Sequence, residues 1–60
     1  MTNGDRIEVL WAMRESGREV ERWLPGVLVN RHQDGRCVVQ MDNGSYCNDA
    51  APENVRRAGE

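Results

Sequence analysis

The chain of 60 residues contains no Lys, no Phe and only three aromatic side chains, those of two Trp and one Tyr. It also lacks an apolar run approaching the ~20 residues that cross a membrane, and it has no hydrophobic region of a secretory signal. These absences predict a soluble, cytoplasmic protein with no membrane partner. At this length we expect a single domain over residues 1–60, with its core at about 4–57 and short polar tails.

Thiols and imidazoles are scarce: the chain has two cysteines, Cys37 and Cys47, and one histidine, His32. A small secreted domain held by disulfides normally carries more cysteines, and two thiols alone do not complete a four-ligand zinc site. The spacing of His32 and the nearby acidic residues does not match a metal site either. We therefore expect no bound metal and no cofactor.

Acidic residues outnumber basic ones by ten to eight, all eight basic residues are Arg, and the net charge is −2. A nucleic-acid-binding domain of this size is usually basic, so the balance disfavours a nucleic-acid partner. An alternative remains in which a local patch contacts phosphate, formed by Arg31, Arg36, Arg56 and Arg57. No nucleophile, base and oxyanion donor are arranged in the sequence to suggest catalysis, so we do not expect an enzyme.

Residues 6–11 alternate between polar and apolar side chains, which predicts a half-buried strand with Ile7, Val9 and Trp11 on one face. Trp11 is therefore either a core residue or an exposed platform at the end of that strand. The charged residues 12–21 have Ser16-Gly17 at their centre. They form either a loop or the tip of a long hairpin in which Arg and Glu face each other across the strands.

Residues 22–31 predict a second strand that is partly apolar on both faces. Trp23, Val27 and Val29 share one face, and we expect Trp23 to lie in the core on this side. Leu24 and Leu28 share the other face. A bend or bulge is expected at Pro25-Gly26, because Pro lacks an amide donor and Gly relaxes the backbone.

Residues 36–41 predict a third strand with Cys37, Val39 and Met41 on one face, and residues 45–49 predict a short fourth strand. Asn43-Gly44 between them is the preferred composition of a type I′ turn. A two-residue loop places Cys47 opposite Gln40, and a three-residue loop leaves the two thiols diagonal, about 7–8 Å apart. Neither register permits a disulfide, so free thiols are expected.

A turn is expected at residues 33–35, a short 3₁₀ turn at residues 52–54 and a last short strand at residues 55–57. The fold class predicted is all-β. Four ordered segments, residues 4–9, 23–29, 38–44 and 52–56, resemble those of a Tudor-type domain within the wider class of SH3-like barrels. The resemblance implies a five-stranded barrel with the 3₁₀ turn before the last strand.

Tudor-type domains commonly read methylated Lys or Arg through a cage of aromatic rings. By position, Trp11 matches one cage ring, but Leu24 and Met41 stand where two others are expected, and Asn43 replaces a polar cage member. A chain with three aromatic residues does not supply such a cage, so methyl-lysine reading is not expected. The resemblance then implies a non-catalytic protein- or peptide-binding module, with a groove between loops lined by Trp11, Met41, Asn43 and Tyr46.

A weaker resemblance connects the chain to type II plasmid dihydrofolate reductases, which are SH3-like barrels assembled around a central pore. It rests on residues 4–7, on the pair Trp23 and Gly26, and on Gly44-Ser45. Residues 46–49 differ from the segment that lines the pore, so the activity is not implied. A homo-oligomeric barrel with a small-molecule site between subunits remains an alternative, and it predicts exposed Leu10, Leu24 or Leu28.

Overall fold

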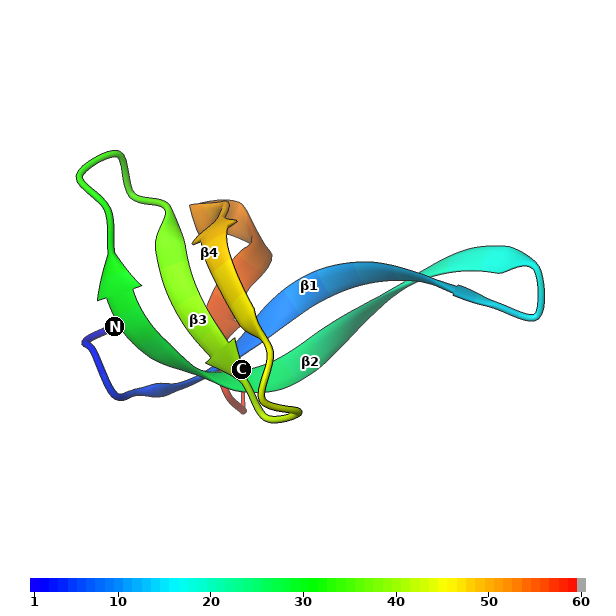
Figure 1. The fold of residues 1–60 in the computed structure, drawn as a ribbon, viewed down its shortest axis with the longest axis horizontal. Helices are drawn as coiled ribbons and strands as arrows, with labels where there is room; N and C mark the ends of the chain where they lie inside the picture. The colour runs from blue at the N-terminus through cyan, green and yellow to red at the C-terminus, as the bar shows by residue number, and fades with distance from the viewer. Residues whose placement is uncertain (60) are drawn as a thin grey trace.

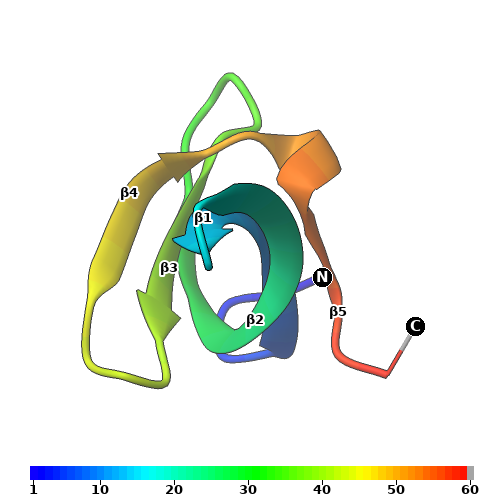
Figure 2. The same cartoon turned by 90° about the vertical axis from the view of Figure 1, so that its right-hand side faces the viewer.

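The computed structural model describes residues 1–59. It contains five strands and one 3₁₀ turn: β1 (Arg6–Glu15), β2 (Arg18–Arg31), β3 (Cys37–Met41), β4 (Tyr46–Ala50), η1 (Pro52–Asn54) and β5 (Val55–Arg57) (Figure 1). The strands form one antiparallel sheet in the order β4-β3-β2-β1-β5. Viewed along the β1–β2 hairpin, β4 lies on one side of the molecule and β5 on the other (Figure 2). The all-β class and the 3₁₀ turn are confirmed, whereas the sheet is not closed into a barrel.

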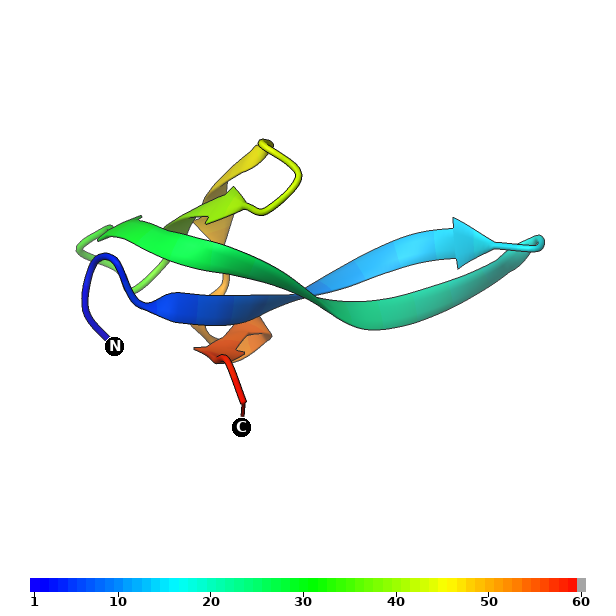
Figure 3. The ribbon, with the colours of Figure 1, turned by 90° about the horizontal axis from the view of Figure 1, so that it is seen from below.

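The β1–β2 hairpin extends well beyond the rest of the sheet (Figures 1 and 3). Its pairing runs out to Glu15 opposite Arg18, whereas β5 reaches only Val9 on β1 and β3 reaches only Gly26 on β2. Residues 10–25 therefore form a two-stranded projection, which we call the arm. Its tip has positive φ at both Ser16 and Gly17, 51° and 78°, as the favoured two-residue hairpin turns require. The long-hairpin alternative is confirmed and the loop alternative is wrong.

Side chains of β1, β2 and β3 form the centre of the core, where Ile7, Leu28 and Val39 are almost fully buried. The prediction for β3 is confirmed, since its buried residues are Cys37, Val39 and Met41. The remaining buried members are Val9, Ala50 and Val55.

The expectation that Trp23 lies in the core is wrong, because the face of β2 directed to the core carries Gly26 and Leu28 instead. A Cβ atom on Gly26 would come within 2.8 Å of the backbone oxygen of Gln40. The backbone of β2 thus lies directly against β3 at Gly26. Gly26 and Leu28 share the buried parity, so the opposite parity, which includes Trp23, points outward. Trp23 is only half-buried there, and Val29, beside a bulge, is exposed.

The β3–β4 turn differs from the predicted type I′ turn. Met41 N donates to Ser45 O at 2.7 Å, and Gly44 N donates to Met41 O at 2.9 Å. The loop therefore has three residues, 42–44, and Gly44 alone of the three has a positive φ, at 93°. Further along, a bulge in the β3–β4 pairing places Cys37 opposite Ala50 and Val39 opposite Cys47. Both thiols are free, as predicted.

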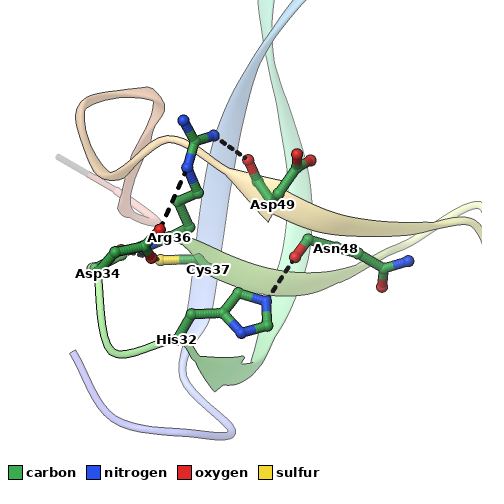
Figure 4. A network of polar contacts seen from close by, with 7 residues as sticks. His32, Asp34, Arg36, Cys37, Asn48 and Asp49 are labelled. Atoms are coloured by element: carbon green, nitrogen blue, oxygen red, sulfur yellow. Dashed lines mark hydrogen bonds and ion pairs between the residues drawn. The ribbon is translucent and has the colours of Figure 1, made fainter.

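A small polar network attaches the β2–β3 turn to the edge strand β4 (Figure 4). His32 Nε2 lies 2.9 Å from the carbonyl oxygen of Asn48, and because a carbonyl only accepts, Nε2 is the donor. Arg36 Nη1 donates to the carbonyl oxygen of Asp49 at 3.2 Å, while its Nε lies 3.6 Å from Asp34 Oδ2. These contacts hold the C-terminal part of β4, which pairs with β3 alone among the strands of residues 1–59.

Candidate functional site

A groove lies where the arm leaves the sheet, beside the β3–β4 turn. One hollow of about 180 Å³ lies between the arm and this turn, and a second of about 200 Å³ lies beneath the turn. The two share Leu24, Met41 and Asn43, so we treat them as one site and call it the arm groove. Its full lining is Trp11, Met13, Leu24, Pro25, Met41, Asp42, Asn43 and Ser45.

The apolar side of the groove continues the core stripe of β1 past the end of the core. Side chains alternate along a strand, so Trp11 and Met13 point to the same face as buried Val9. Leu24 lies directly opposite Val9 and adds to this face from β2. No other strand pairs with this part of the hairpin within residues 1–59, and Trp11 is 41% exposed there.

The other side of the groove is the β3–β4 turn, which polar contacts hold in place. Arg6 binds the carboxylate of Asp42 through both terminal nitrogens, at 3.0 and 2.7 Å. Hydrogen bonding to this guanidinium lowers the pKa of Asp42. Asp42 N donates to Pro25 O at 3.1 Å, and Ser45 N donates to Asn43 Oδ1 at 2.9 Å. The turn is thereby attached to both β1 and β2, so this wall of the groove is preformed.

Three of the four residues predicted for the groove meet in it: Trp11, Met41 and Asn43. Tyr46 does not belong to its lining, because the three-residue turn places it opposite Gln40 on the outer face, where it is 59% exposed. A two-residue turn would have placed Tyr46 opposite Met41 instead. The expectation for Tyr46 rested on its position beside this turn, and with three turn residues its ring lies on the other face.

Met13 and Leu24 also line the groove, although neither was predicted as a groove residue. The charges of residues 12–21 obscured the period-two pattern, although Met13 continues the parity of Val9 and Trp11. The same alternation continues to the tip of the arm. Pairing β2 with β1 outward from a two-residue turn at Ser16-Gly17 would have placed Leu24 opposite Val9, on the same face.

The four arginines of the predicted phosphate patch belong to two separate parts of the sheet. Arg56 and Arg57 lie on the edge strand β5, whereas Arg31 ends β2 and Arg36 precedes β3. Arg36 contacts Asp34, as described above, and Arg56 donates to Glu8 Oε1 at 2.8 Å. Two of the four positive charges are therefore already close to carboxylates.

The oligomeric alternative required exposed leucines on the protomer. Leu28 is 1% exposed and lies at the centre of the core, so it is not available to a partner. Leu10 and Leu24 are half-buried, on opposite faces of the hairpin.

Within residues 1–59 no group of three His, Cys, Asp or Glu side chains is placed to hold a metal ion. His32 contacts Asn48, while the thiol of Cys37 lies 3.7 Å from the carbonyl oxygen of Gly35. The described residues include no helix of the length and hydrophobicity that a membrane crossing requires. Comparisons with protein-family models, with curated proteins and with solved structures found no match to this chain.

Proposed function

We propose that this chain is a non-catalytic binding module of the SH3-like, Tudor-type class, and that it holds an apolar segment of a protein partner in the arm groove. Support for the class comes from the ordered sequence segments together with the five-stranded antiparallel sheet and the 3₁₀ turn before its last strand. Support for binding comes from the groove itself.

The observation that carries the proposal is the uncovered apolar face of the arm. An isolated two-stranded hairpin is at best marginally stable in water, and an apolar face usually packs against another layer. Trp11 and Met13 instead border an open groove whose floor includes Met41. Trp offers a large apolar surface with one polar edge, and Met adapts its shape to varied side chains. A partner's apolar side chain would bury the exposed parts of Trp11 and Met13 and would contact the small accessible part of Met41.

The test selects peptides from a displayed library of random dodecapeptides and measures their affinities by fluorescence anisotropy. We expect Trp11→Ala and Met13→Ala each to weaken binding about tenfold or more, as for residues at the centre of an interface. Tyr46→Ala removes an exposed ring from the outer face and is the matched control, expected to change affinity less than about twofold.

Selected peptides that bind Trp11→Ala and Met13→Ala as well as the unmodified chain would overturn the proposal, as would failure to enrich any peptide. A duplex DNA oligomer serves as a second probe. Tight DNA binding that falls steeply with salt and is lost on substituting Arg56 or Arg57 would favour the nucleic-acid alternative instead.

A further inference from the structure

One edge of the arm has a free row of backbone hydrogen-bonding groups next to the groove. Strand β3 pairs with β2 from Gly26 onward. Just before this point, Asp42 N donates a hydrogen bond to the carbonyl oxygen of Pro25. Within the described residues, 18–24 have β1 on one side and no strand on the other. We call this segment the arm edge.

The register identifies which residues present these groups. In an antiparallel strand, successive residues direct their N–H and C=O groups to alternate sides. A two-residue turn closes on a hydrogen-bonded pair, here Glu15 and Arg18, so the even-numbered residues of β2 bond to β1. Glu19, Glu21 and Trp23 therefore direct their N–H and C=O groups outward. The carbonyl of Pro25 follows the same alternation and bonds to Asp42 on that side.

We propose that the arm edge accepts an extended peptide as a third strand of the arm, and that this peptide alternates apolar with basic side chains. The inference rests on the proposed function and specifies the chemistry of its ligand. On the groove face the new strand would lie beside Val20, Arg22 and Leu24. Arg22 is already paired with Glu15, so the two apolar neighbours favour apolar side chains on this face of the peptide. On the opposite face it would lie beside Glu19 and Glu21, and opposite charges on neighbouring strands stabilise their pairing.

Charge complementarity favours such a ligand over a second copy of this chain. Two copies related by a twofold axis would pair their arm edges in antiparallel fashion. Centring this pairing on Val20 sets Glu19 opposite Glu21 of the other copy and Arg18 opposite Arg22. Centring it on Glu21 or Arg22 sets that residue opposite itself. Each of these registers opposes like charges, which destabilises a sheet.

The arm edge and the groove are parts of one surface. The β3–β4 turn meets β2 at Pro25, so a strand added along residues 18–24 would continue the line of β3 beyond this turn. An apolar side chain near Leu24 would then lie on the face that Trp11 and Met13 share. Backbone pairing would supply part of the affinity, and the groove would select the side chain.

The test uses an acetylated, amidated octapeptide of alternating Arg and Val as the probe and ¹⁵N-labelled protein. On binding, we expect amide hydrogen exchange to slow about tenfold or more at Glu19, Glu21 and Trp23, because their N–H groups gain acceptors. The amides of Val20 and Arg22 are already paired with β1 and should change much less. This odd-even pattern distinguishes strand addition from nonspecific attraction of a cationic peptide.

Two matched peptides and one variant complete the experiment. The same octapeptide with N-methyl groups on alternate residues should lose most of its affinity, and an octapeptide of alternating Glu and Val should not bind. Glu21→Arg reverses one charge on an exposed side chain, so the Arg-containing peptide should bind it more weakly. A preserved spectrum of the core residues in this variant confirms that it is folded.

The outcomes separate the two proposals. Strand addition is overturned if the peptide changes the NMR chemical shifts of Trp11 and Met13 without slowing amide exchange at Glu19, Glu21 and Trp23. Equal binding of the N-methylated peptide overturns it too. Either result leaves the groove as the site. Absence of binding by the Arg-containing peptide also overturns strand addition. The groove proposal fails separately, if library peptides bind Trp11→Ala and Met13→Ala unchanged.

Discussion

The guanidinium of Arg56 lies over the indole ring of Trp23, with its central carbon 3.9 Å from the ring centroid. The Nε atom of the same guanidinium donates to Glu8 Oε1 at 2.8 Å. Glu8 and Arg56 are also direct partners in the pairing of β1 with β5. One side chain thus attaches the short edge strand to both strands of the long hairpin, at the base of the arm.

Arg56→Ala should lower the free energy of unfolding by about 1 kcal/mol, since it removes a partly desolvated cation–π contact and an ion pair. Chemical denaturation followed by Trp fluorescence measures this change. Arg57→Ala is the matched control: it removes the same charge from the next position on β5, where the side chain is exposed, and should change stability less than about 0.5 kcal/mol. Equal effects of the two substitutions would contradict the role given to Arg56.

Gly26→Ala should destabilise the fold by about 1–3 kcal/mol, because the new methyl group meets the backbone oxygen of Gln40 at 2.8 Å and a methyl of Val39 at 3.0 Å. A backbone oxygen within a sheet has little freedom to move aside. Gln40→Ala keeps this oxygen and removes only an exposed side chain, so it should be close to neutral. A fully stable Gly26→Ala would show that β2 and β3 lie further apart than the structure has them.

The fold was predictable from the sequence where its signals are local. The strand periods of residues 6–11 and 36–41, and the 3₁₀ turn at Pro52, are local signals, and each is found where expected. The side of β2 that faces the core depends on the register of β2 with β1 and β3, which is not encoded within residues 22–31. The hydrophobicity of Trp23, Val27 and Val29 therefore predicted the wrong face of β2 for the core. In the observed pairing with β1 and β3, Leu28 faces the core and Trp23 does not.

The candidate site was predictable to a similar extent. Trp11 and Met41 lie on strands whose parity was correct, and both line the groove. The face on which Tyr46 lies depends on the length of one turn, and Asn43-Gly44 is compatible with loops of two or three residues. The structure adopts the longer one, with Gly44 as the left-handed residue that closes it. One extra loop residue moved Tyr46 to the opposite face.

The two cysteines should differ in reactivity. Cys37 is 1% exposed in the core, whereas Cys47 on the edge strand β4 is half-buried. A thiol must be accessible to react, so Ellman's reagent should modify Cys47 first under native conditions and Cys37 only as the fold opens. Cys47→Ser should remove the fast phase and leave the slow one.

Denaturant provides the control for this experiment, because both thiols should react at once when the chain is unfolded. If the unfolded chain does not react with Ellman's reagent unless it has first been reduced, the two cysteines form a disulfide. That result would contradict the register in which Cys37 faces Ala50 and Cys47 faces Val39.

Glu15 should titrate below the ordinary glutamate pKa of about 4.3, because Arg22 binds both of its carboxylate oxygens at 2.6 and 2.8 Å. A lowered pKa in the folded state means that the unfolded chain binds the proton more readily. The pair therefore contributes stability above pH ~4.3, and this contribution is lost as the pH falls through the lowered pKa. The carboxyl ¹³C chemical shift of Glu15, followed by NMR across this range, measures the folded value.

Arg22→Ala should return the pKa of Glu15 towards its ordinary value, because it removes the hydrogen bonds and the positive charge that hold the carboxylate ionised. Arg14→Ala is the matched control, since Arg14 lies next to Glu15 in sequence but on the opposite face of the arm. Salt should weaken the shift in the unmodified chain, because both side chains are about half exposed. If Glu15 titrates identically with Arg22 and without it, the two strands of the arm do not hold this ion pair in solution.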